Sequence, residues 1–241
     1  MFIILYKVNM RKNVPSSNDP DTCIIVPVYN EASKIARVIS DLSLVNAVII
    51  CVDDGSTDTS AKIIQKSNVI LIQHAFNMGQ GAALQTGFDF GLQNNFSYFL
   101  TFDADGQHQP DDAKNLINAI KNSNKDVIFG SRFLEKTSNT PIAKSLLLKI
   151  ATKYTNLMYN SKLTDTHNGL RIFTKKALQK IRIEQCGMGH ASEIIRKTVA
   201  YHLEYDEIPV YINYSQYSRK KGQKMINSIN ILIENSLSKW I

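Results

Sequence analysis

The sequence lacks any apolar stretch long enough to cross a membrane, and its cysteines lack the spacing of a metal or redox site. The opening run Met1–Tyr6 is too short for a signal-peptide core, and no other stretch approaches about 18 uncharged apolar residues. The three cysteines are an odd number without a C-x-x-C pair, and two of them, Cys23 and Cys51, lie in strand-like apolar runs, which suits buried free thiols. These absences argue against a secreted or integral membrane protein, and we expect a cytoplasmic location.

Internal repeats and low-complexity segments are also absent. The chain has 241 residues, of which 44% are hydrophobic and 20% charged. This balance is typical of a globular protein with a substantial core, and it excludes a disordered, collagen-like or coiled-coil chain. The length suits one large domain or two small ones.

Acidic residues are missing from one long stretch, because 136–164 contains five lysines and no Asp or Glu. The formal net charge of +7 is therefore unevenly distributed. Residues 1–135 carry 11 basic and 14 acidic side chains, and residues 136–241 carry 17 and 7. A uniformly basic nucleic-acid binder would not divide in this way, so we expect no nucleic-acid partner.

Short apolar runs alternate with longer amphipathic ones in the first half of the chain. The expected strands are Cys23–Val28, Ala47–Val52, Val69–Gln73, Tyr98–Phe102 and Val127–Phe129, and the expected helices are 31–42, 57–67, 79–93 and 110–122. Strands separated by helices of this length predict a mostly parallel, Rossmann-like sheet with helices on both faces. Ligands bind such sheets beyond the carboxyl ends of the strands.

The second half has a different pattern. A helix is expected over 141–162, a strand over 170–173, a helix around 190–201 and a strand near 207–214. The tail 224–241 is expected to form an amphipathic helix. The apolar stripes of 141–160 and of this tail suit core packing, an oligomer contact or a membrane surface.

Carboxylates follow three of the expected strands. Glu31 follows the first strand, Asp53 and Asp54 the second, and Asp103 and Asp105 the fourth. Carboxylates gathered at one edge repel one another unless a cation or hydrogen-bond donors lie between them. Asp103 and Asp105 suit Mg²⁺ or Mn²⁺, to which Gln107 would add a neutral oxygen. Ser56 and Asp58 are explained equally well as helix N-caps.

Two further turns are candidates for phosphate binding. Gly79 and Gly81 lie where a helix begins after the third strand, which suits either phosphate or a plain tight turn. Arg132 ends the fifth strand, where it could bind a phosphate through two hydrogen bonds.

These motifs together resemble the family 2 glycosyltransferases, and within them the dolichyl- and polyprenyl-phosphate sugar transferases. The motifs are P-V-Y-N-E (27–31), V-D-D-G-S-T-D (52–58), N-M-G-Q-G-A (77–82), D-A-D-G-Q-H (103–108), G-S-R (130–132), D-T-H-N-G-L-R (165–171) and S-R-K-K-G-Q-K (218–224). The resemblance covers about 22–224.

The resemblance implies a GT-A fold, a nucleotide-diphosphate sugar donor and inversion at the sugar carbon. By position, the nucleotide-sugar would be held by Pro27, Tyr29, Glu31, Asp53, Asp54, Gly79, Asp103 and Asp105. Asp103, Asp105 and Gln107 would hold the metal, with Asp105 also catalytic. Arg132 would face the acceptor phosphate, and Arg219 and Lys224 would close over the phosphates.

The acceptor stays open between polyprenyl phosphate and a lipid-linked glycan. Transfer to a hydroxyl needs a general base, whereas a phosphate is already a nucleophile. Glu193 is the candidate base, with a structural role as the alternative, and His190 suits a capping or packing role equally well. The lack of an adjacent Glu-Asp pair favours the phosphate. A pseudo-transferase that binds nucleotide-sugar without turnover is the non-enzymatic alternative.

Two other enzyme classes fit poorly. Haloacid-dehalogenase-type phosphatases carry their D-x-D-G on the first strand, and nucleotidylyltransferases need a glycine- and arginine-rich loop there. We therefore expect a flexible leader (1–20), one GT-A domain with nucleotide-sugar (21–135) and acceptor-side (136–223) halves, and the C-terminal helix (224–241). Contact with the inner face of the membrane would be peripheral. The sequence leaves the sugar, the nucleotide and the oligomeric state open.

Overall fold

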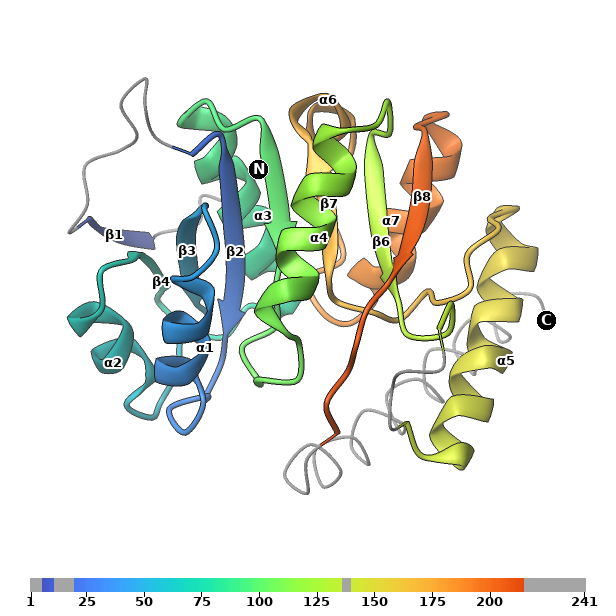
Figure 1. The fold of residues 1–241 in the computed structure, drawn as a ribbon. Helices are drawn as coiled ribbons and strands as arrows, with labels where there is room; N and C mark the ends of the chain where they lie inside the picture. Colours follow the sequence, from blue (N-terminus) through green and yellow to red (C-terminus); the bar gives the residue numbers. More distant parts are fainter. Residues whose placement is uncertain (1–5, 11–19, 136–139, 215–241) are drawn as a thin grey trace.

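A computed structural model of the chain describes the backbone of residues 6–10 and all atoms of residues 20–135 and 140–214. Its centre is an eight-stranded sheet with the order β1-β4-β3-β2-β5-β7-β6-β8 (Figure 1). Strands β2 to β6 and β8 run in one direction, whereas β1 and β7 run against their neighbours. The expected mostly parallel α/β sheet is confirmed.

The strands are β1 (Tyr6–Met10), β2 (Thr22–Val28), β3 (Val48–Asp53), β4 (Ile70–His74), β5 (Tyr98–Thr101), β6 (Val127–Ser131), β7 (Arg171–Thr174) and β8 (Tyr205–Pro209). The helices are α1 (Ile35–Leu42), α2 (Ser60–Lys66), α3 (Gln80–Gln93), α4 (Pro110–Lys121), α5 (Ile142–Tyr159), α6 (Lys175–Lys180) and α7 (His190–Ala200). No helix in the described part of the chain is long and apolar enough to span a membrane.

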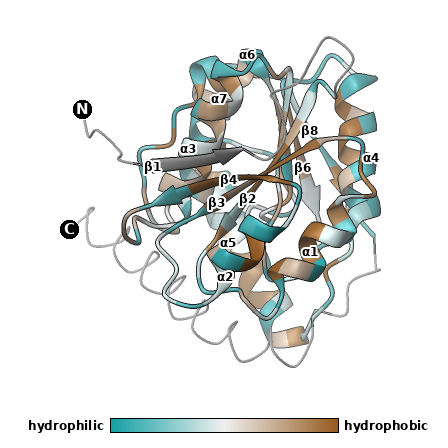
Figure 2. Ribbon diagram, turned by 90° about the vertical axis from the view of Figure 1, so that its left-hand side faces the viewer, coloured by the Kyte–Doolittle hydropathy of each residue, from teal (hydrophilic) through white to brown (hydrophobic). Residues whose placement is uncertain are grey.

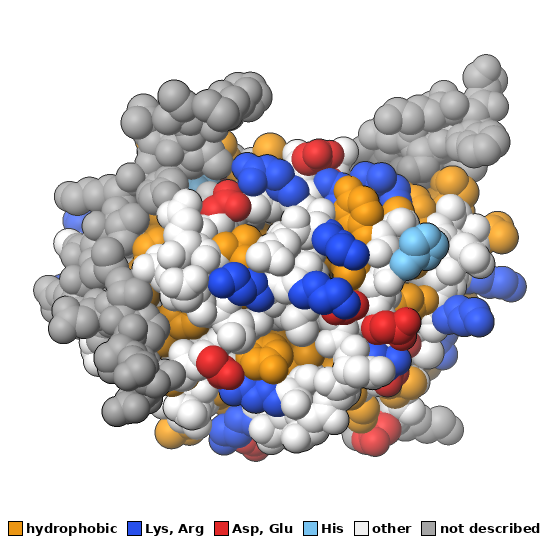
Figure 3. All heavy atoms as spheres, turned by 90° about the horizontal axis from the view of Figure 1, so that it is seen from above, with side chains coloured by type: hydrophobic (Ala, Val, Ile, Leu, Met, Phe, Trp, Pro, Cys, Tyr) orange, Lys and Arg blue, Asp and Glu red, His pale blue; other side chains and the backbone are white. Residues whose placement is uncertain are grey.

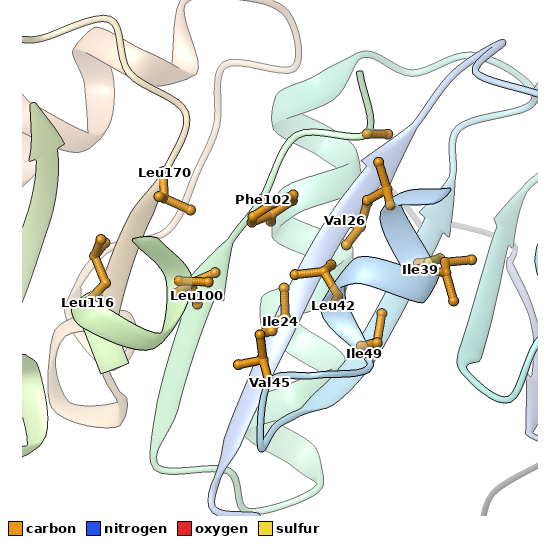
Figure 4. Packing of buried hydrophobic residues seen from close by; sticks show 14 of the residues in the cluster. Ile24, Val26, Ile39, Leu42, Val45, Ile49, Leu100, Phe102, Leu116 and Leu170 are labelled. Carbon is orange, nitrogen blue, oxygen red and sulfur yellow. The ribbon is translucent and has the colours of Figure 1, made fainter. Parts of the chain in front are cut away.

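Apolar side chains on the central strands point alternately to two cores. On β2, Ile24 and Val26 join the core under α1, α2 and α4, which Figure 4 shows at close range. Cys23 and Ile25 join the second core, under α3, α6 and α7. Because both faces of the sheet are covered, its inner strands read as continuous apolar runs, and they appear mostly brown in Figure 2. Cys23 and Cys51 are buried free thiols, as expected.

Several elements depart from the sequence-based expectations. Helix α1 begins at Ile35 rather than at 31, because the 31–34 segment forms a turn in which Glu31 O accepts from Lys34 N and Ile35 N. Helix α2 likewise begins at Ser60, and β8 covers Tyr205–Pro209 rather than 207–214. The short helix α6 was not expected. Within the expected flexible leader, β1 is instead a strand paired with β4.

The two ends of the sheet differ in character. Figure 3 shows the end where most strands begin, with basic and acidic side chains mixed across it. Two ion pairs lie there. Asp21, before β2, pairs with Lys121 at the end of α4. Asp126, before β6, pairs with Lys176 on α6. The opposite end, at the bottom of Figure 1, is where the motif residues lie.

Candidate active site

The motif residues meet at the carboxyl end of the sheet because six strands end there. Asp53 ends β3, Asp103 and Asp105 follow β5, and Arg132 follows β6. Since β7 runs in the opposite direction, the 165–170 turn before it lies at the same end. The sheet therefore places carboxylates from the first half beside the basic second half.

The loops after β2 and β3 hold one another in place. Asn30 Oδ1 accepts a hydrogen bond from Thr57 N at 2.9 Å, and Ser60 Oγ accepts one from Glu31 N at 2.9 Å. Asp58 Oδ1 accepts from Ser60 N at 2.8 Å and Oδ2 from Ala32 N at 3.0 Å, so Asp58 joins the two loops, while the N-cap position of α2 is Thr59. This arrangement leaves Tyr29 45% exposed at the mouth of the site.

Asp53 and Asp54 have different environments although both are buried. Asp54 accepts hydrogen bonds from His74 Nδ1 at 2.7 Å, from Met78 N at 2.9 Å and from Gly79 N at 2.7 Å. Both of its oxygens are thus used to hold the next loop. Asp53 Oδ1 is buried and has no hydrogen-bond partner among the described residues. Of the pair, Asp53 is the carboxylate with an oxygen left for a ligand.

The glycine turn before α3 packs against protein and does not present its N–H groups to a phosphate. Gly79 N donates to Asp54, and Gly81 N donates to Cys186 O at 2.7 Å. A Cβ at Gly79, where φ is +99°, would lie 2.4 Å from Cys186 O. Close backbone packing explains these glycines, so this geometry does not support nucleotide binding by Gly79.

Asp103 and Asp105 lie side by side in a half-buried turn after β5. Asp103 accepts from Gln80 Nε2 at 3.1 Å and from His108 Nε2 at 3.2 Å. Burial and the charge of Asp103 raise the pKa of Asp105 above its ordinary value. Gln107 donates through both its backbone N and its side-chain amide to Asp105. These bonds hold Gln107 against Asp105, and its role as a metal ligand stays a prediction.

This donor set suits a hard divalent cation. Two adjacent carboxylates supply oxygen ligands, and the repulsion that raises the pKa of Asp105 would be relieved by a positive ion. The described residues contain no cluster of three or more His, Cys, Asp or Glu side chains placed to hold a metal. Carboxylate pairs of this kind suit Mg²⁺ or Mn²⁺, which keep further positions for phosphate oxygens.

Arg132 is buried and already bound to protein groups. Its Nε donates to Asp165 Oδ2 at 2.6 Å, one terminal nitrogen to Tyr214 Oη at 2.6 Å, and the other to His167 O at 3.0 Å. Burial alone would lower the pKa of Arg132, but Asp165 and Tyr214 raise it. The guanidinium of Arg132 therefore contacts protein groups, and direct contact with an acceptor phosphate stays a prediction. The arginine positions the 165–168 turn.

Lys144, on the first turn of α5, reaches the site although its sequence gave no signal beyond a lysine-rich stretch. Its Nζ lies 4.4 Å from the ring centroid of Tyr214, whose hydroxyl is bound to Arg132. The pKa of Lys144 is lowered by burial and by Arg132, and raised by Asp105. A half-buried ammonium between a guanidinium and a carboxylate is suited to an anionic ligand.

The Glu193 carboxylate is bound by protein groups, which does not favour its action as a general base. Its carboxylate accepts from the backbone N of Glu184 at 3.0 Å and of Gln185 at 2.8 Å, and pairs with Lys197 Nζ at 2.8 Å. Burial alone would raise its pKa, but these hydrogen bonds and Lys197 lower it. The geometry supports the structural alternative. Likewise His190 Nδ1 lies 2.8 Å from Gly187 O, which suits a capping role.

Two pockets in the described part of the chain differ in chemistry. A small one behind Asp103 is also lined by Gln80, Arg171 and His190. A wider one of about 580 Å³ lies at the opposite end of the sheet, where α1 ends and β3 begins, and has no charged lining residue. The wider pocket therefore lacks charged side chains that could bind a metal ion or a phosphate. Arg219 and Lys224 lie outside the described residues.

Comparison with known proteins identifies the family. The family model described as glycosyl transferase family 2 matches residues 23–182. The chain belongs to this family. It is a glycosyltransferase, and the sequence resemblance to the family is confirmed.

Its relatives include enzymes that are named for lipid phosphates. The UDP-N-acetylglucosamine–dolichyl-phosphate N-acetylglucosaminyltransferase of Methanococcus voltae is 32% identical over 86% of this chain and 92% of its own. The polyprenol monophosphomannose synthase of Mycolicibacterium smegmatis is 26% identical over 87% and 82%. The resemblance to the polyprenyl-phosphate sugar transferase branch is thus confirmed.

Solved structures confirm the GT-A fold. Glucosyl-3-phosphoglycerate synthase from Mycobacterium tuberculosis, crystallised with Mn²⁺, UDP and glucosyl-3-phosphoglycerate, superposes with a TM-score of 0.67. The match covers 88% of this chain and 78% of that one at 14% identity. At this identity the likeness concerns the fold.

Proposed function

We propose that this glycosyltransferase moves a sugar from a nucleotide-diphosphate sugar to polyprenyl phosphate, with inversion at the sugar carbon and with the aid of Mg²⁺ or Mn²⁺. The relatives named for dolichyl phosphate and polyprenol support the acceptor class, and the structural neighbours crystallised with UDP or GDP-mannose and Mn²⁺ support the donor class. The transfer reaction would take place at the cytoplasmic face of a membrane, to which the chain attaches peripherally.

The hydrogen bonds of Glu193 are the observation that favours a phosphate acceptor over a hydroxyl acceptor. An inverting transfer to a hydroxyl needs a base with a free lone pair near the sugar. Glu193 instead accepts two backbone hydrogen bonds and pairs with Lys197, which keeps it ionised and directed at the 184–185 backbone. A phosphate acceptor carries its own negative charge and needs no such base. The phosphate is therefore the acceptor that this site suits.

On the donor side, Asp53 is suited to bind the nucleotide through its unpartnered buried oxygen. Pro27, Tyr29 and Glu31 lie beside it on the neighbouring strand end and complete the proposed nucleotide surface. Asp103 and Asp105 would hold the divalent cation. When bound, that cation would supply positive charge to the departing diphosphate.

On the acceptor side, Lys144 would contact the phosphate, and Arg132 would position the turn and the tyrosine around it. The segment after β8 crosses this end of the sheet, with Asn213 N donating to Gln107 O at 2.9 Å. Arg219 follows Tyr214 by five residues, so even an extended chain keeps it within about 17 Å. We propose that Arg219 and Lys224 add further positive charge here.

The test is transfer of labelled sugar from UDP-, GDP- and dTDP-sugars to undecaprenyl or dolichyl phosphate, compared with glycan acceptors, with Mg²⁺ or Mn²⁺. Asp105→Asn should lower turnover more than about 100-fold because the cation loses a charged ligand. Asp111→Asn is a matched control, since Asp111 is exposed and pairs with Lys114 on the surface of α4. Nucleotide binding without turnover on any acceptor would instead establish the pseudo-transferase.

A further inference from the structure

Helix α5 has two faces of different kinds. Leu148, Ala151, Thr152 and Thr155 are buried against the protein. Five large apolar side chains are exposed instead, and apart from Met158 (40%) they share one side of the helix. These four are Ile142 (90%), Leu146 (61%), Ile150 (55%) and Leu157 (83%). At 3.6 residues per turn these four fall within an arc of about 80° and along about 22 Å of the helix axis. Single exposed apolar residues are ordinary, but a continuous stripe marks a contact surface.

The charge around this stripe has one sign. Lys149 and Lys153 are exposed on the same side of α5, interleaved with the apolar residues. Lys149 Nζ lies over the Phe133 ring at 5.4 Å. The sequence from 136 to 164 has no Asp or Glu, so neighbours along the chain do not neutralise these lysines. An apolar stripe on a helix whose charged residues are all lysines is complementary to an anionic lipid surface.

The position of α5 connects this stripe to the candidate site. Figure 1 shows α5 at the outer side of the molecule, beyond β6 and β8. On its first turn, Lys144 points inward to Tyr214, whereas Ile142 and Leu146 are exposed. The exposed stripe and the proposed acceptor phosphate position therefore lie on opposite sides of the same helical turn.

We propose that the outer face of α5, formed by Ile142, Leu146, Lys149, Ile150, Lys153 and Leu157, docks on a membrane that contains anionic phospholipid. The proposal rests on the proposed function, because a polyprenyl phosphate must be reached at a membrane surface. Two other occupants fit the charges less well. A two-fold contact between copies of α5 would place lysines against lysines. The segment 224–241 carries two lysines and one glutamate, and so offers little complementary charge.

The test uses the full chain and vesicles of phosphatidylcholine with or without about 30% phosphatidylglycerol, measured by co-sedimentation. Wild type should bind the anionic vesicles at least tenfold more tightly than the neutral ones, and less tightly as salt rises. Ile142→Ser with Leu157→Ser, and separately Lys149→Glu with Lys153→Glu, should each weaken binding at least tenfold. These side chains are exposed, so both variants should fold.

Matched controls carry equivalent changes elsewhere. Leu44→Ser removes an apolar side chain that is 70% exposed at the other end of the sheet, and Lys62→Glu with Lys66→Glu reverses two exposed lysines on α2. Both controls should bind vesicles within twofold of wild type. Equal binding by the α5 variants and wild type, or no binding by wild type, would overturn the proposal.

Two further measurements separate the outcomes. Donor hydrolysis in solution should be unchanged in the α5 variants, so a failure of docking is distinguishable from a failure of the proposed transfer. A cysteine at position 157, introduced as Leu157→Cys, should react with a maleimide in solution and become protected by anionic vesicles. Protection already present without vesicles would mean that protein covers this face, which would refute membrane docking.

Discussion

Replacing Glu193 by glutamine tests whether this residue is a base or a support for the site. The substitution keeps the side-chain shape but removes the charge that faces Lys197 and the backbone N–H groups of Glu184 and Gln185. These groups hold the 184–186 loop, and Cys186 O in that loop accepts from the first turn of α3. Gln80, which begins α3, donates to Asp103. Glu193 is therefore linked to Asp103, one of the two proposed metal ligands, through the 184–186 backbone and the Gln80 side chain.

The expected cost follows from the buried pair. Breaking a buried ion pair costs about 3–5 kcal/mol, and a hydrogen bond to a charged group contributes about 1.5–3 kcal/mol. Lys197 keeps part of its stabilisation, because it also contacts Glu184 Oε2 at 3.3 Å and Arg182 O. We expect Glu193→Gln to lower the free energy of unfolding by about 2–3 kcal/mol. Glu204→Gln, at an exposed pair with Lys125, should cost less than about 0.5 kcal/mol.

The dependence on pH has a definite sign. The folded protein holds the pKa of Glu193 below 4.5, so the ionised carboxylate stabilises the fold above about pH 4.5. This stabilisation is lost as the pH falls through the lower pKa of the folded state. The difference in unfolding free energy between wild type and Glu193→Gln, from urea titrations, should therefore be constant near neutral pH and shrink below about pH 4.5.

Kinetics decide between the two roles. A support should give a fall in kcat of about tenfold, with a pH–rate profile of unchanged shape. A general base should give a loss of about 100- to 10,000-fold and remove one limb of the profile. A loss of that size together with unchanged stability would refute the support role and, with it, the argument for a phosphate acceptor.

Five other substitutions, at four positions, test the remaining parts of the site. Asp53→Asn should weaken nucleotide binding about 10-fold or more in calorimetry with little loss of stability, whereas Asp54→Asn should chiefly lower stability; the reverse pattern would contradict their assignment. Lys144→Ala should raise the KM for the lipid phosphate about 10-fold with the donor KM unchanged. The pKa of Lys144 is lowered, so the affinity of wild type for the lipid phosphate should fall as the pH rises through that pKa. In Lys144→Arg the fall in affinity should occur at higher pH. An affinity that does not change with pH would exclude contact between Lys144 and the phosphate. His108→Ala should weaken Mn²⁺ binding about 10- to 100-fold, measured by the electron paramagnetic resonance of free Mn²⁺, because His108 orients Asp103; unchanged affinity would show that Asp103 needs no such support.

Much of the first half could be predicted because its signals are local. Apolar runs bounded by turn residues define β2 to β6, and the parallel arrangement follows from the helices between them. The same arrangement places Asp53, Asp103 and Asp105 at one end of the sheet. Helix starts were less accurate, because at 31–34 and 57–59 side-chain contacts between the two loops replace the first helical turn.

The motifs alone could not assign roles to individual side chains. Asp53 and Asp54 are adjacent and chemically identical, yet the loop after β4 occupies both oxygens of Asp54 and leaves one oxygen of Asp53. Arg132 and Glu193 were read as reactive because of their positions in motifs. The structure instead gives them buried partners, which are Asp165, 33 positions away, for Arg132 and the nearby Lys197 and 184–185 backbone for Glu193.

The sequence by itself determined the family, the mostly parallel sheet and the end of it at which the chemistry gathers, because these depend on periodicity and on motifs of adjacent residues. The tertiary structure determined which charged side chains have atoms available to bind a ligand. That outcome depends on burial and on hydrogen bonds across the fold, such as the contact of Lys144 with Tyr214 over 70 positions of chain. It also decided that the apolar stripe of α5 is exposed, since periodicity shows that a face exists and only packing shows what covers it.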